Sequence, residues 1–151
     1  MDKFAISVYK QYGYSDQHNI SDFDCMVEII KEKYPDYVAD MNRVMEENYF
    51  YPFNMMYMKK ELFDSYCSWL FDILFELEKR IPYKTYDAQK KRVFGYLSER
   101  LFLVWIRKNK FKVNEISVLN TECKDGIFTK IFRRLNTYST VYLGLDFRKN
   151  K

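Results

Sequence analysis

The sequence predicts a helix-rich α/β domain with few strands, and three observations lead to that prediction. Apolar residues recur at helical spacing over several long segments, and hydrophobic residues make up 48% of the 151-residue chain, enough for a sizeable core. Only two or three segments have the pattern of a strand, and helical segments separate them. The 4 Gly and 3 Pro residues are too few for a disordered or loop-dominated chain.

Helices are expected over much of the first eighty residues. Residues 1–20 carry polar turn material after a short apolar stretch. Ser21 is the expected N-cap of a helix over residues 21–34, because an acidic residue follows three positions later and a proline comes directly after the helix. A short second helix is expected over residues 36–48. The strongest helical pattern, over residues 60–80, is apolar on more than one face and therefore predicts a central helix.

The remaining segments alternate between strand and helix patterns. A nearly continuous apolar and aromatic run predicts a buried strand over residues 53–58. A long helix is expected over residues 86–109 and a strand over residues 111–119. Residues 126–135 predict a short basic amphipathic helix, and residues 140–147 an edge strand or a loose tail. Because strands so isolated make a poor sheet, the chain is expected to be the second part of a larger α/β unit.

Charge and cysteine content restrict the classes of function. Residues 1–75 carry 7 Lys/Arg and 13 Asp/Glu, whereas residues 76–151 carry 18 and 8, so the net charge of +4 conceals a basic second half. Such a half suits a polyanionic ligand, an anionic membrane face or simple solvation. Three widely spaced cysteines and a single histidine argue against a Cys/His zinc site and suit a reducing cytoplasm. Neither a membrane-spanning segment nor a secretory signal is expected.

The densest polar chemistry lies in residues 86–100. On a helix, Arg92 and Glu99 are seven residues apart and share a face, with Gly95 and Ser98 on or near it. A glycine inside a helix costs about 1 kcal/mol relative to alanine, and it is tolerated where a backbone or a ligand packs closely. Arg92 could bind a phosphate while Glu99 accepts a hydroxyl proton. Alternatively, the two side chains form a structural ion pair.

Two residues outside that segment are further candidates. His18 lies in a polar loop ahead of a helix and is either an acid, base or hydroxyl binder, or a surface histidine. Asn54 interrupts the apolar run, and a buried amide needs partners, which could be a ligand at a strand end or a neighbouring backbone. Glycine-rich phosphate loops are missing from the sequence. Basic residues do alternate with aromatic ones in residues 107–112 and 130–134, but nucleic acid is disfavoured because those aromatics follow the spacing of a helical core.

Four stretches of the chain are similar, in this order, to one known family. They are His18–Asp24 with Val27–Asp36, Phe50–Glu61, Trp69–Arg80, and the run Arg92-Val-Phe-Gly-Tyr-Leu-Ser-Glu-Arg-Leu101 with Trp105. Together they resemble the C-terminal half of a bacterial family of capsular and exopolysaccharide glycosyltransferases, long catalogued as a domain of unknown function. The likeness extends from about Ile6 to Glu122.

The resemblance implies the C-terminal part of an A-type, Rossmann-like glycosyltransferase fold over residues 1–122, followed by a basic tail with a short helix over residues 123–151. It implies transfer of a sugar from a nucleotide-sugar donor to a saccharide or lipid-linked acceptor in capsule, exopolysaccharide or lipopolysaccharide synthesis. The N-terminal half of such proteins supplies most nucleotide-binding residues, so that half is an expected partner. No cofactor is expected in this chain, and a divalent metal would be held mainly by the missing half. The expected location is the cytoplasm, with peripheral contact to the inner membrane as an alternative.

The resemblance also assigns roles to individual residues. Glu99 would be catalytic, His18 would lie near the acceptor, and the residues that line or support the sugar site would be Asn54, Arg92, Ser98 and Arg100. Glycosyl transfer needs a cation to offset the leaving diphosphate and, if it inverts, a carboxylate to activate the acceptor hydroxyl; Arg92 and Glu99 are the available pair. The rival hypothesis is a non-catalytic helical module that binds a polyanion or a partner protein.

Overall fold

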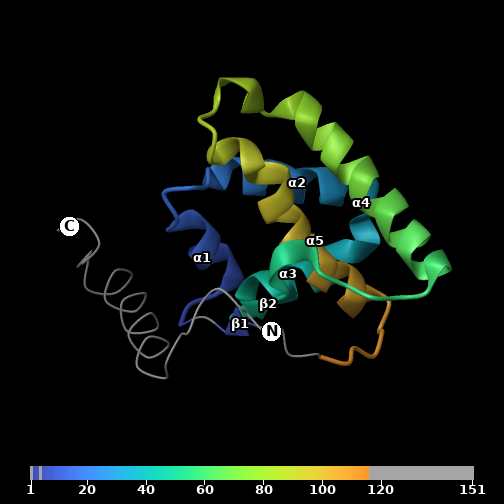
Figure 1. Ribbon diagram of the computed structural model, residues 1–151. Helices are drawn as coiled ribbons and strands as arrows, with labels where there is room; N and C mark the ends of the chain where they lie inside the picture. The colour runs from blue at the N-terminus through green and yellow to red at the C-terminus, as the bar shows by residue number, and fades with distance from the viewer. Residues whose placement is uncertain (1, 4, 116–151) are drawn as a thin grey trace. The chain divides into compact units, whose positions relative to one another are not determined.

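The computed structural model describes residues 2–3 and 5–115, and these residues form a helical fold with almost no sheet (Figure 1). The α-helices are α1 (Val8–Gly13), α2 (Ile20–Lys33), α3 (Val38–Glu46), α4 (Lys60–Arg80) and α5 (Val93–Lys108). The strands β1 (Asp2–Lys3) and β2 (Tyr49–Phe50) pair antiparallel, with Asp2 opposite Phe50. The 3-10 turns are η1 (Pro35–Tyr37), η2 (Pro52–Asn54), η3 (Tyr83–Thr85) and η4 (Lys90–Arg92). All these elements belong to one compact unit, Met1–Lys112.

Helix α5 is the centre of this unit. From Leu101 to Ile106 every residue is buried, so the helix presents apolar side chains on all sides over its second half. It packs against α3, α4 and η2, while α2 packs along α4 and α1 packs against α3 (Figure 1). Helix α4 has the predicted bounds, but it buries one face only and leaves Phe71 and Phe75 exposed. The expectation that it is the central helix was therefore wrong, because its outward aromatics have no layer over them among the described residues.

Two other predicted helices are shifted at their first residue. Helix α2 begins after Asn19, and Ser21 lies inside it instead of capping it. Helix α5 begins at Val93 and not near Tyr86, because the Asp87 carboxylate accepts the amides of Gln89 and Lys90 and closes a separate turn. Helix α1 was not predicted, and it lies between the short apolar stretch that ends at Val8 and the polar turn that begins at Gly13. A serine cap explains its start, since Ser7 Oγ accepts the backbone amide of Lys10.

The buried strand predicted over residues 53–58 is absent. Phe53 and Asn54 adopt left-handed backbone angles, with φ of 69° and 50°, which turn the chain within η2. Phe53 is 71% exposed and Tyr57 is 100% exposed. The prediction was wrong because an apolar run indicates burial only where neighbouring strands cover it, and none of the described residues pairs with this segment.

The predictions near the C-terminus are only partly within the described residues. Residues 111–115 form no strand. The rest of the strand predicted over residues 111–119, the helix over 126–135, the edge strand over 140–147 and the domain boundary after residue 122 lie outside the described residues and stay predictions. Across the part of the chain that the structure describes, none of the helices combines the length and the apolarity needed to cross a membrane.

Candidate functional site

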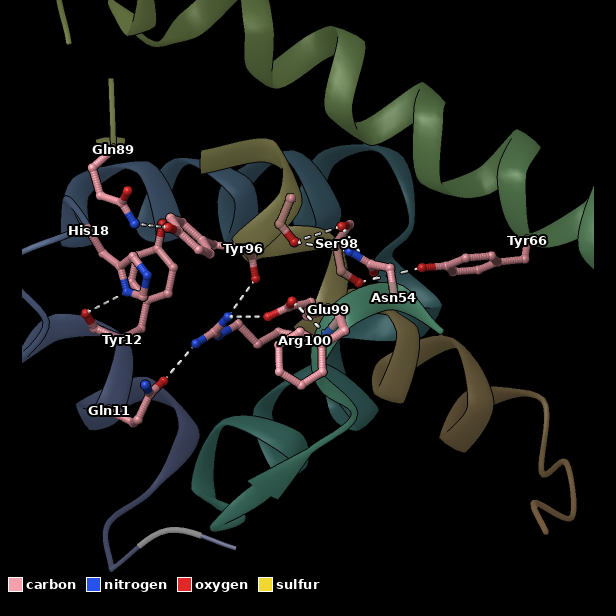
Figure 2. Close-up of polar contacts among 12 residues, drawn as sticks. Gln11, Tyr12, His18, Asn54, Tyr66, Gln89, Tyr96, Ser98, Glu99 and Arg100 are labelled. Carbon is pink, nitrogen blue, oxygen red and sulfur yellow. Dashed lines mark hydrogen bonds and ion pairs between the residues drawn. The ribbon is translucent and has the colours of Figure 1, made fainter. Parts of the chain in front are cut away.

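A polar cluster joins turn η2 to the first half of α5 (Figure 2). The Asn54 amide donates to the carbonyl oxygen of Gly95 over 3.3 Å. Ser98 Oγ lies 2.8 Å from the same carbonyl and 3.1 Å from Asn54 Oδ1. The carbonyl of Ser98 in turn accepts the hydroxyl of Tyr66 on α4. The structure thus brings Asn54 and Ser98 together, although Asn54 sits in a turn and not at the end of a strand.

Glu99 holds the same turn through its carboxylate. Its Oε1 accepts the backbone amide of Phe53 over 2.8 Å, and its Oε2 lies 3.5 Å from Arg100 Nη1. The side chain is only 16% exposed. Burial raises the pKa of Glu99 above its ordinary value, although the Phe53 amide and the nearby arginines act in the opposite direction. The carboxylate is consequently a better proton acceptor than a solvated glutamate.

Arg100 is a buried anchor. Its Nη1 donates to the Tyr96 carbonyl and its Nη2 donates to Gln11 Oε1 on α1, each over 2.6 Å. The guanidinium lies over the rings of Phe50 and Tyr12, 4.2 and 5.0 Å from their centroids. Burial lowers the pKa of Arg100 to about 10, so it stays charged at neutral pH. Its contacts tie α5 to α1 and β2.

His18 completes the cluster on the other side of Arg100. Its ring stacks on Tyr12 at 4.2 Å and lies 4.5 Å from the ring of Tyr96, as Figure 2 shows. Nδ1 lies 3.2 Å from the Tyr12 carbonyl, and because a carbonyl only accepts, Nδ1 carries the proton and Nε2 is left as an acceptor. Burial, followed by the Arg100 charge, lowers the pKa of His18 to about 4. His18 is therefore neutral at pH 7 and not an ordinary surface histidine.

Arg92 contacts this cluster through the ring of Tyr96. It is exposed at the N-terminal end of α5, where its guanidinium lies 5.2 Å from the Tyr96 ring centroid. Within the described residues no ion pair joins Arg92 to Glu99, although the Arg92 charge is one of those that act to lower the pKa of Glu99. The predicted shared helix face of Arg92 and Glu99 does not form, because Arg92 belongs to η4, before α5 begins.

Gly95 also departs from its expected environment. A Cβ placed on Gly95 would meet no atom of the described structure within 4 Å. Close packing against this glycine was expected, and among the described residues the space beside it is open. The Gly95 carbonyl oxygen, however, accepts hydrogen bonds from the side chains of both Asn54 and Ser98.

Sequence reasoning missed the residues that orient this cluster: Gln11, Tyr12, Gln89 and Tyr96. Gln89 donates to the Tyr96 hydroxyl and to Gln17. Tyr96 had a detectable signal, since it lies four residues before Arg100 on the same helix face. Gln11 and Tyr12 gave no such signal in the sequence, because their partner on α5, Arg100, is more than eighty residues away.

Metal ligands are not gathered in this part of the chain. Within residues 2–3 and 5–115, no group of three or more His, Cys, Asp or Glu side chains is arranged to hold a metal ion.

Residues 2–110 match the family model described as domain of unknown function DUF4422. The chain belongs to the DUF4422 family. It is also similar to a solved structure described as the WbbM bifunctional glycosyltransferase in its apo form, with 35% identity and a TM-score of 0.66. The match covers 69% of this chain and 18% of that protein, so this DUF4422 chain spans less than a fifth of its solved relative. No curated protein matches it.

Proposed function

We propose that this DUF4422 chain is part of a glycosyltransferase that moves a sugar from a nucleotide-sugar donor to a saccharide or lipid-linked acceptor in bacterial capsule, exopolysaccharide or lipopolysaccharide synthesis. The observation that carries the proposal is the 35% identity to a bifunctional glycosyltransferase over 69% of the chain. The donor would be bound largely by an α/β half of the domain, which acts as the partner of this chain. The reaction would take place on the cytoplasmic side, beside the inner membrane when the acceptor is lipid-linked.

Glu99 is the general base in this proposal. Its carboxylate would remove the proton of the acceptor hydroxyl while that oxygen bonds to the anomeric carbon and the bond from that carbon to the donor diphosphate breaks. The support is its position: the side chain is mostly buried, its pKa is raised, and a small exposed part remains open to substrate. Arg92 would offset the charge of the leaving diphosphate, since it is an exposed cation whose described contact is the Tyr96 ring.

The other residues of the cluster would position these two. The polar atoms of Asn54 and Ser98 are engaged with each other and with Gly95, and Arg100 is directed into the interior. They therefore support the turn that holds Glu99. His18 would accept a hydrogen bond from an acceptor hydroxyl at Nε2.

Donor binding is tested by calorimetry on the full chain mixed with the part of the related bifunctional glycosyltransferase that the chain does not cover. The Arg92→Ala variant should weaken nucleotide-sugar binding at least about tenfold, as expected for a lost charged hydrogen bond. Lys84→Ala, which removes another exposed cation, is the matched control and should bind normally. Equal weakening by both substitutions, with steep salt dependence and no preference for the nucleotide sugar over another polyanion, would favour the polyanion-binding module.

Catalysis is tested on the same mixture by following sugar transfer. Glu99→Gln should lower kcat by about 10²–10⁴ while donor affinity is unchanged, because the amide keeps an oxygen for the Phe53 backbone but cannot take a proton. Transfer at the unaltered rate in Glu99→Gln would remove Glu99 from the role of base.

A further inference from the structure

The segment from Met55 to Met58 is extended, and among the described residues no strand pairs with it. It runs extended from turn η2 to the start of α4 (Figure 1), and Met55 has φ −88° and ψ 117°. No hydrogen bond within the described structure uses a backbone amide or carbonyl of these four residues. Unpaired extended backbone is the feature that allows another strand to add to a sheet edge.

The side chains of this segment alternate as they do in a strand that covers a core. Met56 and Met58 are partly buried and pack against the hydrophobic core, whereas Met55 and Tyr57 are exposed. The segment carries no charge before Lys59, and so lacks the charges by which natural edge strands discourage pairing.

Both ends of the segment are fixed. At its start, the left-handed Phe53 and Asn54 are held by Glu99, Ser98 and the Gly95 carbonyl. At its end, the Lys59 carbonyl accepts the Phe63 amide in the first turn of α4. Left-handed backbone at non-glycine residues is strained and persists where the surroundings enforce it. The segment is therefore held in the extended form in advance of any partner, which lowers the cost of binding one.

We propose that Met55–Met58 is an open sheet edge to which a strand of the donor-binding α/β half of the glycosyltransferase adds. This inference rests on the proposed function for the identity of the partner. Main-chain donors and acceptors along an extended segment are satisfied in series only by another extended backbone. The related glycosyltransferase has more than four-fifths of its length outside the part that this chain matches, and that remainder can supply the strand.

The experiment measures amide hydrogen exchange of the full chain, alone and with the uncovered part of the related glycosyltransferase. Alone, the amides of residues 55–58 should exchange close to the unprotected rate at every chain concentration. In the complex, every second amide of the segment, either those of Met55 and Tyr57 or those of Met56 and Met58, should be protected at least about a hundredfold. A strand added on one side bonds alternate residues, and exchange then requires opening of the added strand.

Two substitutions at Tyr57 separate backbone pairing from side-chain contact. Tyr57→Pro removes one amide and keeps an extended backbone, and Tyr57→Ala removes the exposed ring but keeps the amide. If the protected amides are those of Met55 and Tyr57, Tyr57→Pro should weaken the complex at least about tenfold more than Tyr57→Ala, the loss expected for a ladder hydrogen bond and its neighbours. If they are those of Met56 and Met58, the two variants should bind equally well, because the Tyr57 amide then points away from the added strand. Unchanged circular dichroism of both variants verifies that the chain still folds.

Three results would overturn the inference: no complex, a complex in which residues 55–58 stay unprotected, or protection in the chain alone that rises with concentration. The last would assign the edge to a second copy of the chain. If the complex forms with protected amides but binds no nucleotide sugar, the docking edge stands and the proposed function is the part that fails.

Discussion

Arg100 illustrates how the sequence can draw attention to a polar residue without showing where its side chain points. The residue is 2% exposed, and its two terminal nitrogens are taken by Tyr96 and Gln11. The sequence predicts that residues 86–100 hold the densest polar chemistry of the chain. However, an arginine that points to a sugar and an arginine that points into the core give the same pattern in the sequence. The distinction depends on Gln11 and Tyr12, which no local spacing connects to α5.

The Arg100 contacts predict that an apolar replacement lowers the free energy of unfolding more than a conservative one. Arg100→Met should destabilise the fold by about 3 kcal/mol, because it leaves the Glu99 carboxylate partly buried without its cation and the Gln11 and Tyr96 oxygens without a donor. Arg100→Lys should cost about 1–2 kcal/mol, since an ammonium cannot reach both oxygens. Urea unfolding measures both values. Stability unchanged in Arg100→Met would contradict the anchoring role.

His18 predicts a particular pH dependence of stability. Burial and the Arg100 charge depress its pKa from 6.5 to about 4, so the unfolded chain binds a proton that the folded chain does not. The stability that the neutral His18 ring contributes to the fold is complete above pH 6.5 and is lost as the pH falls toward 4. The matched control is His18→Phe, which keeps a ring against Tyr12. Between pH 6.5 and pH 4 the free energy of unfolding of the wild type should fall relative to that of the variant. The fall should be smaller than the roughly 1.4 kcal/mol per pH unit expected when unfolding takes up one full proton. Parallel stability curves for the two proteins would show that His18 is not titrating in this way.

Among the elements, the long helices were predictable and the turns between them were not. Helix α4 has the predicted first and last residues because a continuous apolar period and a following proline determine it locally. The segment 53–58 was misassigned because its geometry depends on the Glu99 and Ser98 contacts, which come from more than forty residues away. Helix propensity and periodicity contain no information of that range.

The open space beside Gly95 leads to a prediction about α5. Gly95→Ala should stabilise the chain by about 0.5–1 kcal/mol, because a methyl group meets no described atom and alanine favours the helix. Thermal unfolding tests this, with Ser98→Ala as the comparison, which should destabilise because Ser98 bridges Asn54 and Gly95. If Gly95→Ala instead destabilises, the space beside it is filled in solution.

At the scale of the whole molecule, the described unit has a well-buried core and an uncovered apolar face. Its core is continuous from α1 to α5. Yet Phe63, Phe71 and Phe75 are exposed on α4, and the rings of Phe71 and Phe75 stack on each other at 5.7 Å. Contiguous exposed aromatics of this kind mark interaction surfaces in soluble proteins. The sequence predicted a helix that is apolar on more than one face, with Phe63 among its apolar residues, and in the structure Phe63 is exposed.

Removing the stacked pair should therefore change the behaviour of the surface without changing the fold. The variant Phe71→Ser/Phe75→Ser should bind less of an apolar fluorescent dye and self-associate less at high concentration, while its free energy of unfolding stays within about 1 kcal/mol of the wild type. Ile73→Ser is the matched control: it lies on the same helix but is fully buried, and it should cost several kcal/mol. If the double variant unfolds as readily as Ile73→Ser, the two rings belong to the core of this unit and the uncovered face does not exist. If it instead keeps its stability but binds the proposed donor-binding half poorly, α4 contributes to the same interface as the Met55–Met58 edge.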